Sequence, residues 1–366
     1  MNENYLLHNE TAKKLYFEYA KDLPIIELCS DWNFDEVIYN NITEAFLNND
    51  CYKLDAMRIL GVEEKFITGD ASDYEKFKVF CSILPKFAGH PIYLLSHIEL
   101  KKNFECDLSI CEENCEAIWQ YCNSKITSEL FTDDVVMQKS KLSFVNVFHL
   151  VAFNEINHPS VVDLKTLETR LLEIVSNLDK NGCKIAVHPT IDIFEKPNLY
   201  KANEIIQKIK REDQVASEDY NHIFMQINRT LGIEYKKRNW SLIWYKEDYW
   251  WEESNIYNNI KALEYLEKSN ALPISYNLLS IYTDDTEKEI SERLIRFAKK
   301  NILGNFVLMA DFISPTTAFA RTDYIRRIVC NIIGKWVENG EYTSDEKTLK
   351  KLIEDILYNN LKEAIS

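Results

Sequence analysis

Two residues near the N-terminus have types and spacing that could bind a metal ion. Cys29 and Asp31 lie two positions apart, after an apolar stretch (residues 24–28) that predicts a buried strand. Side chains two apart in a strand project to one face, and a thiolate and a carboxylate both bind zinc. His188 could supply a third ligand. We favour the alternative, that no metal binds here, because free cysteine packs more often than it ligates.

His188 and Tyr52 are the residues that we single out as candidates for catalysis. His188 ends a predicted strand at 183–188, and the carboxyl end of a parallel strand is a usual place for an active-site side chain. The favoured alternative is a buried histidine with satisfied hydrogen bonds. Tyr52 could donate a proton or a hydrogen bond to a ligand, or pack with its hydroxyl bonded elsewhere.

Other chemically suggestive groups have simpler interpretations. Zinc sites pair cysteines two to four apart on turns, a pattern that the cysteines at 106, 111, 115 and 122 do not match. The aromatic run 249–251 could stack on a sugar face, although packing at the rim of a sheet is the more usual role. The acidic run 284–289 indicates the first turn of a helix.

Apolar strands alternate with amphipathic helices along the chain. The clearest helix is 164–181, with leucine and valine on one stripe and Gly182 after it. Further helices are expected at 9–19, 286–302 and 323–338, and a last one near 344 with Thr343 and Glu346 as a capping box. This alternation predicts a parallel sheet with helices outside it. The strands are expected near 24–28, 143–149, 183–188, 240–246, 274–282 and 305–312.

Composition excludes several classes of partner. The net charge of −15 argues against nucleic acid and anionic membrane surfaces, which need a basic face. No apolar stretch approaches the roughly 20 residues that span a bilayer. The nine cysteines and the polar start of the chain predict a reduced, cytoplasmic protein.

Several stretches resemble uronate isomerases, in the order in which that family has them. Residues 304–314 resemble the family's last barrel strand, and 321–341 resemble the helix after it. Residues 9–16 with 21–26 resemble its opening helix and first strand. The other similar stretches are 50–58, 66–73, 89–93, 97–100, 181–183 before His188, and 238–240.

The resemblance implies a distorted (β/α)8 barrel of the amidohydrolase superfamily that interconverts an aldehyde uronate and its keto isomer. In the family, the first strand ends in a His-x-His metal pair, and the matching positions here are Cys29 and Asp31. The aspartate and substrate arginine of the family's Thr-Asp-Ser-Arg motif align with Phe312 and Ser314. Asp311 is one position away, and a shift of one residue on a strand turns a side chain to the other face.

The remaining family positions are only partly kept. The histidine of the family's Gln-Leu-His strand aligns with Tyr245, and its His-Tyr pair becomes Cys51 and Tyr52. The Trp-Arg-Pro-Asp segment, which carries a substrate-binding arginine, has no counterpart. The resemblance leaves Arg58 and Tyr245 as candidate substrate-binding residues.

We therefore expect an α/β fold, a shortened and distorted TIM-type barrel with a helical cap. The barrel would comprise 1–31 and 131–366, with the cap at 32–130 inserted after the first strand. Two strand–helix units of the family are missing, near 150 and 260. A helix, a loop or a second subunit must cover the resulting sheet edge, and we expect a homo-oligomer.

The favoured function is a non-catalytic homologue that binds a small sugar acid or a partner protein, without a cofactor. One alternative is an active glucuronate isomerase with a site rebuilt around Cys29, Asp31, Tyr52 and His188, holding a divalent metal such as zinc. Another is a different lyase or hydrolase on the same barrel, because a fold does not fix a reaction.

Overall fold

The computed structural model describes most of the chain. The described residues are 3–29, 38–48, 50–127, 129–146, 148–149, 152–189, 194–216, 219–245, 253–280, 286–299, 306–309 and 314–366. Within these ranges, no helix combines the length and the apolar character needed to cross a bilayer.

All the strands pair in parallel, and each lies at a place that the sequence pattern predicts. β1 pairs with β2 in one sheet, and a second sheet has the order β3-β4-β5-β6-β7. One residue, Val147, separates β2 from β3 along the chain. The bounds are β1 Ile25–Cys29, β2 Leu142–Asn146, β3 Phe148–His149, β4 Ile185–Pro189, β5 Ser241–Tyr245, β6 Ile274–Ser280 and β7 Phe306–Met309.

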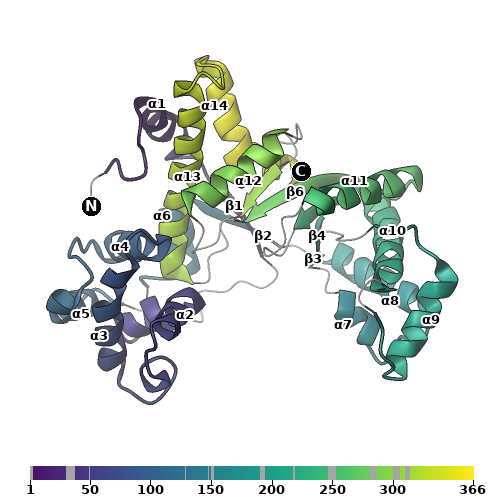
Figure 1. Ribbon diagram of the computed structural model, residues 1–366, viewed down its shortest axis with the longest axis horizontal. Helices are drawn as coiled ribbons and strands as arrows, with labels where there is room; N and C mark the ends of the chain where they lie inside the picture. Colours follow the sequence, from purple (N-terminus) through teal and green to yellow (C-terminus); the bar gives the residue numbers. More distant parts are fainter. Residues whose placement is uncertain are drawn as a thin grey trace.

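Helices connect these strands, as parallel pairing requires. They lie on either side of the strands, with α2–α6 and α13 on one side and α7–α11 on the other (Figure 1). After β2 and β3, the helices are α7 Ala152–Asn157, α8 Leu164–Lys180, α9 Leu199–Lys210, α10 Tyr220–Arg238, α11 Glu253–Lys268, α12 Glu287–Lys299, α13 Pro315–Glu338, α14 Glu346–Glu354, η8 Asp355–Asn359 and α15 Asn360–Ile365.

The segment between β1 and β2 is helical where it is described, and it has its own hydrophobic core. That core includes Phe46, Phe77, Phe80 and Phe104. We call this segment, residues 38–140, the helical block; the boundaries of a separate cap domain stay a prediction. Its helices are η2 Glu44–Asn48, α2 Cys51–Ile59, η3 Glu64–Phe66, α3 Asp73–Ile83, η4 Leu84–Phe87, α4 Pro91–Phe104, η5 Glu112–Asn114, α5 Cys115–Asn123 and α6 Asp133–Ser140.

Both faces of strand β4 are buried. On β4, Ile185 and Val187 share an apolar cluster with Ile26, Ile243 and Val307 from other strands. The alternate residues Ala186 and Leu242 pack instead with α8, α9 and α10. This two-sided burial is typical of parallel sheets with helices on their faces.

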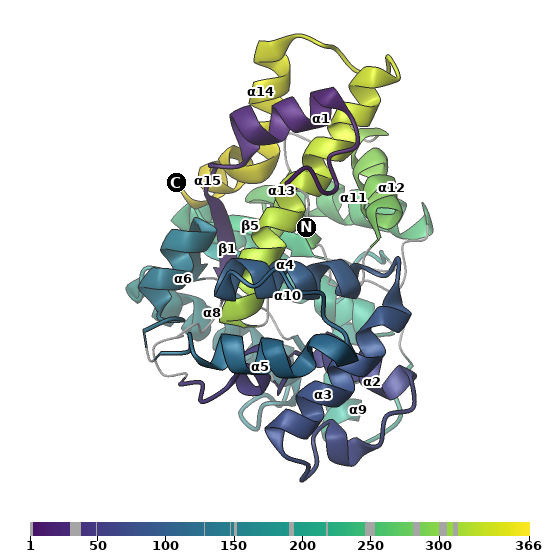
Figure 2. The ribbon, with the colours of Figure 1, turned by 90° about the vertical axis from the view of Figure 1, so that its left-hand side faces the viewer.

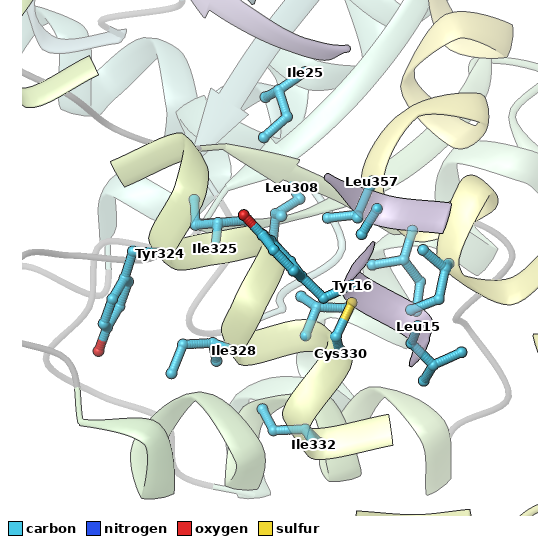
Figure 3. Close-up of a cluster of buried hydrophobic side chains, with 14 of the residues drawn as sticks. Leu15, Tyr16, Ile25, Leu308, Tyr324, Ile325, Ile328, Cys330, Ile332 and Leu357 are labelled. Carbon is cyan, nitrogen blue, oxygen red and sulfur yellow. The ribbon is translucent and has the colours of Figure 1, made fainter. Parts of the chain in front are cut away.

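α13 is the central helix of the block that contains the N-terminus. Every residue from Pro315 to Gly334 is buried, and the helix runs past α1 (Glu10–Lys14) and α4 (Figure 2). Figure 3 shows Ile325, Ile328 and Ile332 of α13 around Tyr16 of the π-helical segment η1 (Leu15–Ala20). Burial on all sides places α13 in the core.

The C-terminal segment reaches back to the first and last strands. η8 and α15 contact β7, η8 also contacts β1, and β1 and β7 are themselves in contact. Leu361 and Ala364 join the apolar cluster formed by the strands. Among the described residues no ladder joins β1 to β7.

Two expected helix starts differ from the observed ones. The last helix is capped by Asp345, whose carboxylate accepts from Thr348 N at 2.9 Å, so the predicted capping box of Thr343 and Glu346 is wrong. α13 begins at Pro315 rather than near 323, because Ser314 and Thr317 form a capping box ahead of it. Helix 164–181 is confirmed as α8, and Gly182 follows it with a φ of 77°.

Ala271, just before β6, lies against Gly232 of α10, so the substitution Gly232→Ala tests the fold. A Cβ at Gly232 would lie 1.9 Å from the carbonyl oxygen of Ala271. We expect a loss of about 1–3 kcal/mol in the free energy of unfolding from this overlap. An uncrowded helix would gain about 1 kcal/mol from the same change. Urea unfolding measures the sign.

The matched control is Lys347→Ala on an exposed position of α14. It should stay within about 0.5 kcal/mol of the wild type. A Gly232→Ala protein that is more stable than the wild type would contradict the close packing of α10 against Ala271.

Candidate functional site

Ligands of parallel α/β sheets bind at the carboxyl ends of the strands, and Cys29, His188 and Tyr245 lie at or near such ends. Asp31 lies outside the described residues, as do the aligned positions 311 and 312. Cys29 and Tyr245 are the last residues of β1 and β5, and only their backbone is described. Their side-chain roles therefore stay predictions.

His188 lies near the end of β4, and its imidazole is held by helix α10. Its Nδ1 lies 2.8 Å from Asn228 Oδ1, and its Nε2 lies 2.9 Å from the Tyr235 hydroxyl. The side chain is 1% exposed. It shares its strand face with Ala186, which packs against the outer helices. Both ring nitrogens are thus engaged on the helix side of the sheet.

Tyr52 begins a cluster of charged groups where the helical block meets α13. The Arg321 guanidinium of α13 lies 5.9 Å from the centroid of the Tyr52 ring. Next to Tyr52 on α2, Lys53 is 1% exposed, and its Nζ lies 2.7 Å from Glu99 Oε2 and 3.1 Å from Asp50 Oδ2. We call Asp50, Tyr52, Lys53, Glu99 and Arg321 the interface cluster.

Asp50 and Lys53 each have a local reason for their positions. Asp50 is the N-cap of α2, and its side chain accepts from Lys53 N. The Lys53 ammonium also donates to Phe46 O at 2.7 Å and lies 3.7 Å from the centroid of the Phe46 ring. Removing a buried ammonium from water is costly unless such partners surround it.

Glu99 titrates near neutrality. Burial raises the pKa of its carboxyl from 4.5 to about 7, against the attraction of Lys53 and Arg321, which favours the charged form. A carboxyl with this pKa exchanges a proton near pH 7, as general acids and bases must. The interface cluster therefore combines a proton-exchanging group with a tyrosine and two buried cations.

The start of α13 is tied to the same region. The Thr316 hydroxyl donates to Ala45 O at 2.9 Å, and the Asn103 amide donates to Thr316 O at 3.0 Å. The Ser314 side chain accepts from Thr317 N and so caps the helix. The position that the resemblance assigns to a substrate arginine is thus occupied by a helix cap.

Arg58, the other predicted substrate-binding residue, lies away from this cluster. It is at the C-terminal end of α2, and its guanidinium is 2.8 Å from Asp55 Oδ1 and 2.8 Å from Glu64 Oε1. Its side chain is 42% exposed. The structure brings Tyr52 and Arg321 together, but not Tyr52 and Arg58.

The described residues contain no group of three histidine, cysteine, aspartate or glutamate side chains that could hold a metal ion. In the helical block, Cys106, Cys115 and Cys122 are buried in its apolar core. Both ring nitrogens of His188 are hydrogen-bonded to α10, and its role as third ligand to Cys29 and Asp31 stays a prediction.

The sequence pattern missed Lys53, Glu99 and Arg321. One signal was available: Asp50 is three positions before Lys53, the spacing of an N-cap and its helix. Glu99 lies in α4 and Arg321 in α13, and nothing local in the sequence shows that distant helices bring these charges together.

The fold places the chain in the α/β class of proteins. Parallel strands with helical connections and a helical segment after the first strand describe an α/β protein. The sequence profile of the family described as Glucuronate isomerase matches residues 1–149 and 280–364. The chain therefore belongs to the glucuronate isomerase family.

Curated relatives match the chain from end to end. It is 27% identical to the uronate isomerase of Caldanaerobacter subterraneus subsp. tengcongensis, over 99% of this chain and 98% of the relative. It is 28% identical to that of Caldicellulosiruptor bescii, with the same coverage. Both alignments run over 458 positions, against 366 residues here, so the relatives carry segments that this chain lacks.

Solved structures have the same fold. The uronate isomerase of Thermotoga maritima superposes with a TM-score of 0.81 at 19% identity, over 100% of this chain and 99% of that one. The glucuronate isomerase of Caulobacter crescentus gives a TM-score of 0.75 at 14% identity, over 100% and 96%. A metal-dependent hydrolase fold from Lactobacillus casei gives 0.55 at 9%, over 96% and 97%.

The raised pKa of Glu99 predicts how stability depends on pH. The folded protein holds this proton more tightly than the unfolded chain, so the contribution is complete below pH 4.5 and is lost as the pH rises to about 7. We expect the wild type to lose on the order of 3 kcal/mol through this group between these limits. Glu99→Gln should lack that part of the pH dependence.

The measurement is urea unfolding of both proteins at pH 5 and pH 8. Glu112→Gln, which changes an exposed glutamate of η5, is the control and should keep the wild-type slope. Identical pH slopes for Glu99→Gln and the wild type would show that Glu99 does not titrate in this range.

Proposed function

We propose that this member of the glucuronate isomerase family does not catalyse the aldose–ketose isomerisation of uronates and instead binds a sugar acid through the family scaffold. The observation that carries the proposal is the donor set at the first strand end. Cys29 and Asp31 stand where the resemblance places a His-x-His metal pair. A metal in such a site would hold and polarise the substrate.

Two features of the described structure support this proposal. His188 could have completed a site with Cys29 and Asp31, but both of its ring nitrogens are hydrogen-bonded to side chains of α10. Ser314, aligned with a substrate arginine, caps α13. Each lost charged contact of this kind removes several kcal/mol of transition-state stabilisation. Binding of a sugar acid needs fewer charged contacts than catalysis does, because a single charged or polar contact can hold a carboxylate.

The interface cluster is the part of the scaffold best suited to a sugar acid. Arg321 supplies positive charge beside Tyr52, whose ring and hydroxyl match the apolar face and the hydroxyls of a sugar. A carboxylate ligand would add to the charges that already act on Glu99. Binding is therefore expected to change the protonation of Glu99.

The finer architecture belongs to the same proposal. We infer that the strands curl into a shortened TIM-type barrel, supported by the contact between β1 and β7 and by the packing of η8 on both strands and of α15 on β7. A cytoplasmic location belongs to the same inference. What covers the sheet edge left by the missing units near 150 and 260 stays a prediction. The homo-oligomer stays a prediction, for which light scattering after size exclusion gives the mass.

An active isomerase is the second candidate, favoured by the end-to-end similarity to uronate isomerases at 27–28% identity. The two candidates differ in turnover and in metal content. Purified protein is analysed for divalent metals and assayed with glucuronate and galacturonate. We expect no turnover, and we expect that removal of metal by a chelator leaves uronate binding unchanged.

Ligand binding is measured in the same preparation by thermal unfolding. A uronate at 100 times its Kd should stabilise the folded protein by about 2.7 kcal/mol. The matched pair Asp31→Ala and Asp70→Ala completes the design, because Asp70 is exposed in the helical block. Stoichiometric metal with turnover that Asp31→Ala abolishes and Asp70→Ala retains would establish the active isomerase and overturn our proposal.

A further inference from the structure

A pocket of about 650 Å³ lies among α9, α10 and α11, away from the interface cluster. Its size falls within the range of small-molecule sites, about 300–1,000 Å³. The helices that line it are on the opposite side of the strands from α2 and α13 (Figure 1). It is therefore separate from the site to which the proposed function refers.

The lining of this pocket is cationic. Lys196, Arg229, Lys261 and Lys268 line it, against one acidic residue, Glu264. The whole protein has a net charge of −15. An acidic protein repels anions over most of its surface, whereas a local excess of positive charge attracts them. The charge pattern therefore marks the pocket as a site for an anion.

These cations have few partners of their own. Lys268 pairs with Glu264 at 3.8 Å. Among the described residues, no ion pair or hydrogen bond is made by the charged ends of the side chains of Arg229, Lys196 and Lys261. Arg229 is also partly withdrawn from water. A partly desolvated guanidinium is stabilised by an oxyanion that accepts from its planar set of donors.

An aromatic pair forms another part of the wall. The rings of Phe194 and Tyr265 lie 5.9 Å apart between centroids, and both are partly buried. Gln226 of α10 also lines the pocket, and its side-chain amide donates a hydrogen bond to Glu168 Oε1 at 2.7 Å. The pocket thus offers cations for an anionic group and ring faces for an organic one.

We propose that this pocket binds a small phosphorylated metabolite that contains a ring. The phosphate would lie against Arg229 and Lys261, and the ring would lie against Phe194 and Tyr265. Three cations without carboxylate partners are neutralised better by a phosphate monoester, with its charge of about −2, than by a carboxylate. Phosphate also offers three acceptor oxygens to donors from more than one helix.

Calorimetric titration of the full chain tests this assignment in low salt without phosphate buffer. The probes are glucose 6-phosphate, inorganic phosphate, glucose and glucuronate. We expect saturable binding of glucose 6-phosphate, weaker binding of inorganic phosphate and none of glucose. Equal affinity for glucuronate and glucose 6-phosphate, lost together on substitution of Arg229, would overturn the preference for phosphate.

Arg229→Gln and Lys261→Gln should each raise the Kd for glucose 6-phosphate about tenfold or more, because each removes a charge-assisted contact. Lys347→Gln on the exposed face of α14 is the matched control and should leave the Kd unchanged. Circular dichroism and urea unfolding establish that the variants are folded. Absence of saturable phosphate binding, or a wild-type Kd in both pocket variants, would refute the site.

The substitution Tyr265→Leu distinguishes the contribution of the ligand's ring to binding from that of its phosphate. It should weaken glucose 6-phosphate more than inorganic phosphate, because only the former has a ring to place against the aromatic pair. An equal loss for both probes would contradict the role given to Phe194 and Tyr265.

Discussion

Two adjacent arginines of α13 hold together segments from both ends of the chain. Arg326 Nη2 donates to Leu23 O at 2.8 Å and to Ser140 O at 3.1 Å, the residues that lead into β1 and β2. Arg327 donates to Asp323 at 3.0 Å and to Glu3 O at 2.7 Å. Since α13 follows β7, the helix after the last strand fixes the start of the first two.

The same helix places the helical block over the sheet. Its N-terminal turns bond to η2 and α4 through Thr316, while further along it Asp323 accepts from the Tyr5 and Tyr16 hydroxyls. Although burial raises the pKa of Asp323, Lys102 and Arg327 hold it below its usual value. Buried charges of this kind are stable only with their partners in place. The geometry of the interface cluster therefore depends on α13 remaining where its arginines hold it.

These dependencies explain which features the sequence could predict. Strand positions were predictable because continuous apolar runs bounded by turns are a local signal. The direction of His188 was not, because Ile185, Ala186 and Val187 are all apolar, and a strand buried on both faces shows no alternation that identifies its inner side. The pairing of Lys53 with Glu99 was hidden as well, since it joins helices 46 positions apart. Side chains at Cys29, Asp31 and Tyr245 are a different case, because their roles rest on the resemblance alone.

A shared scaffold does not by itself fix a shared reaction. The chain keeps a TM-score of 0.81 with the Thermotoga maritima enzyme at 19% identity, so packing preserves the fold through extensive replacement of side chains. Ser314 illustrates the distinction. As the N-cap of a helix with twenty consecutive buried residues, it contributes about 1 kcal/mol to the start of α13. A serine suits that structural task, whereas recognition of a uronate carboxylate there would need the charge and planar donors of an arginine.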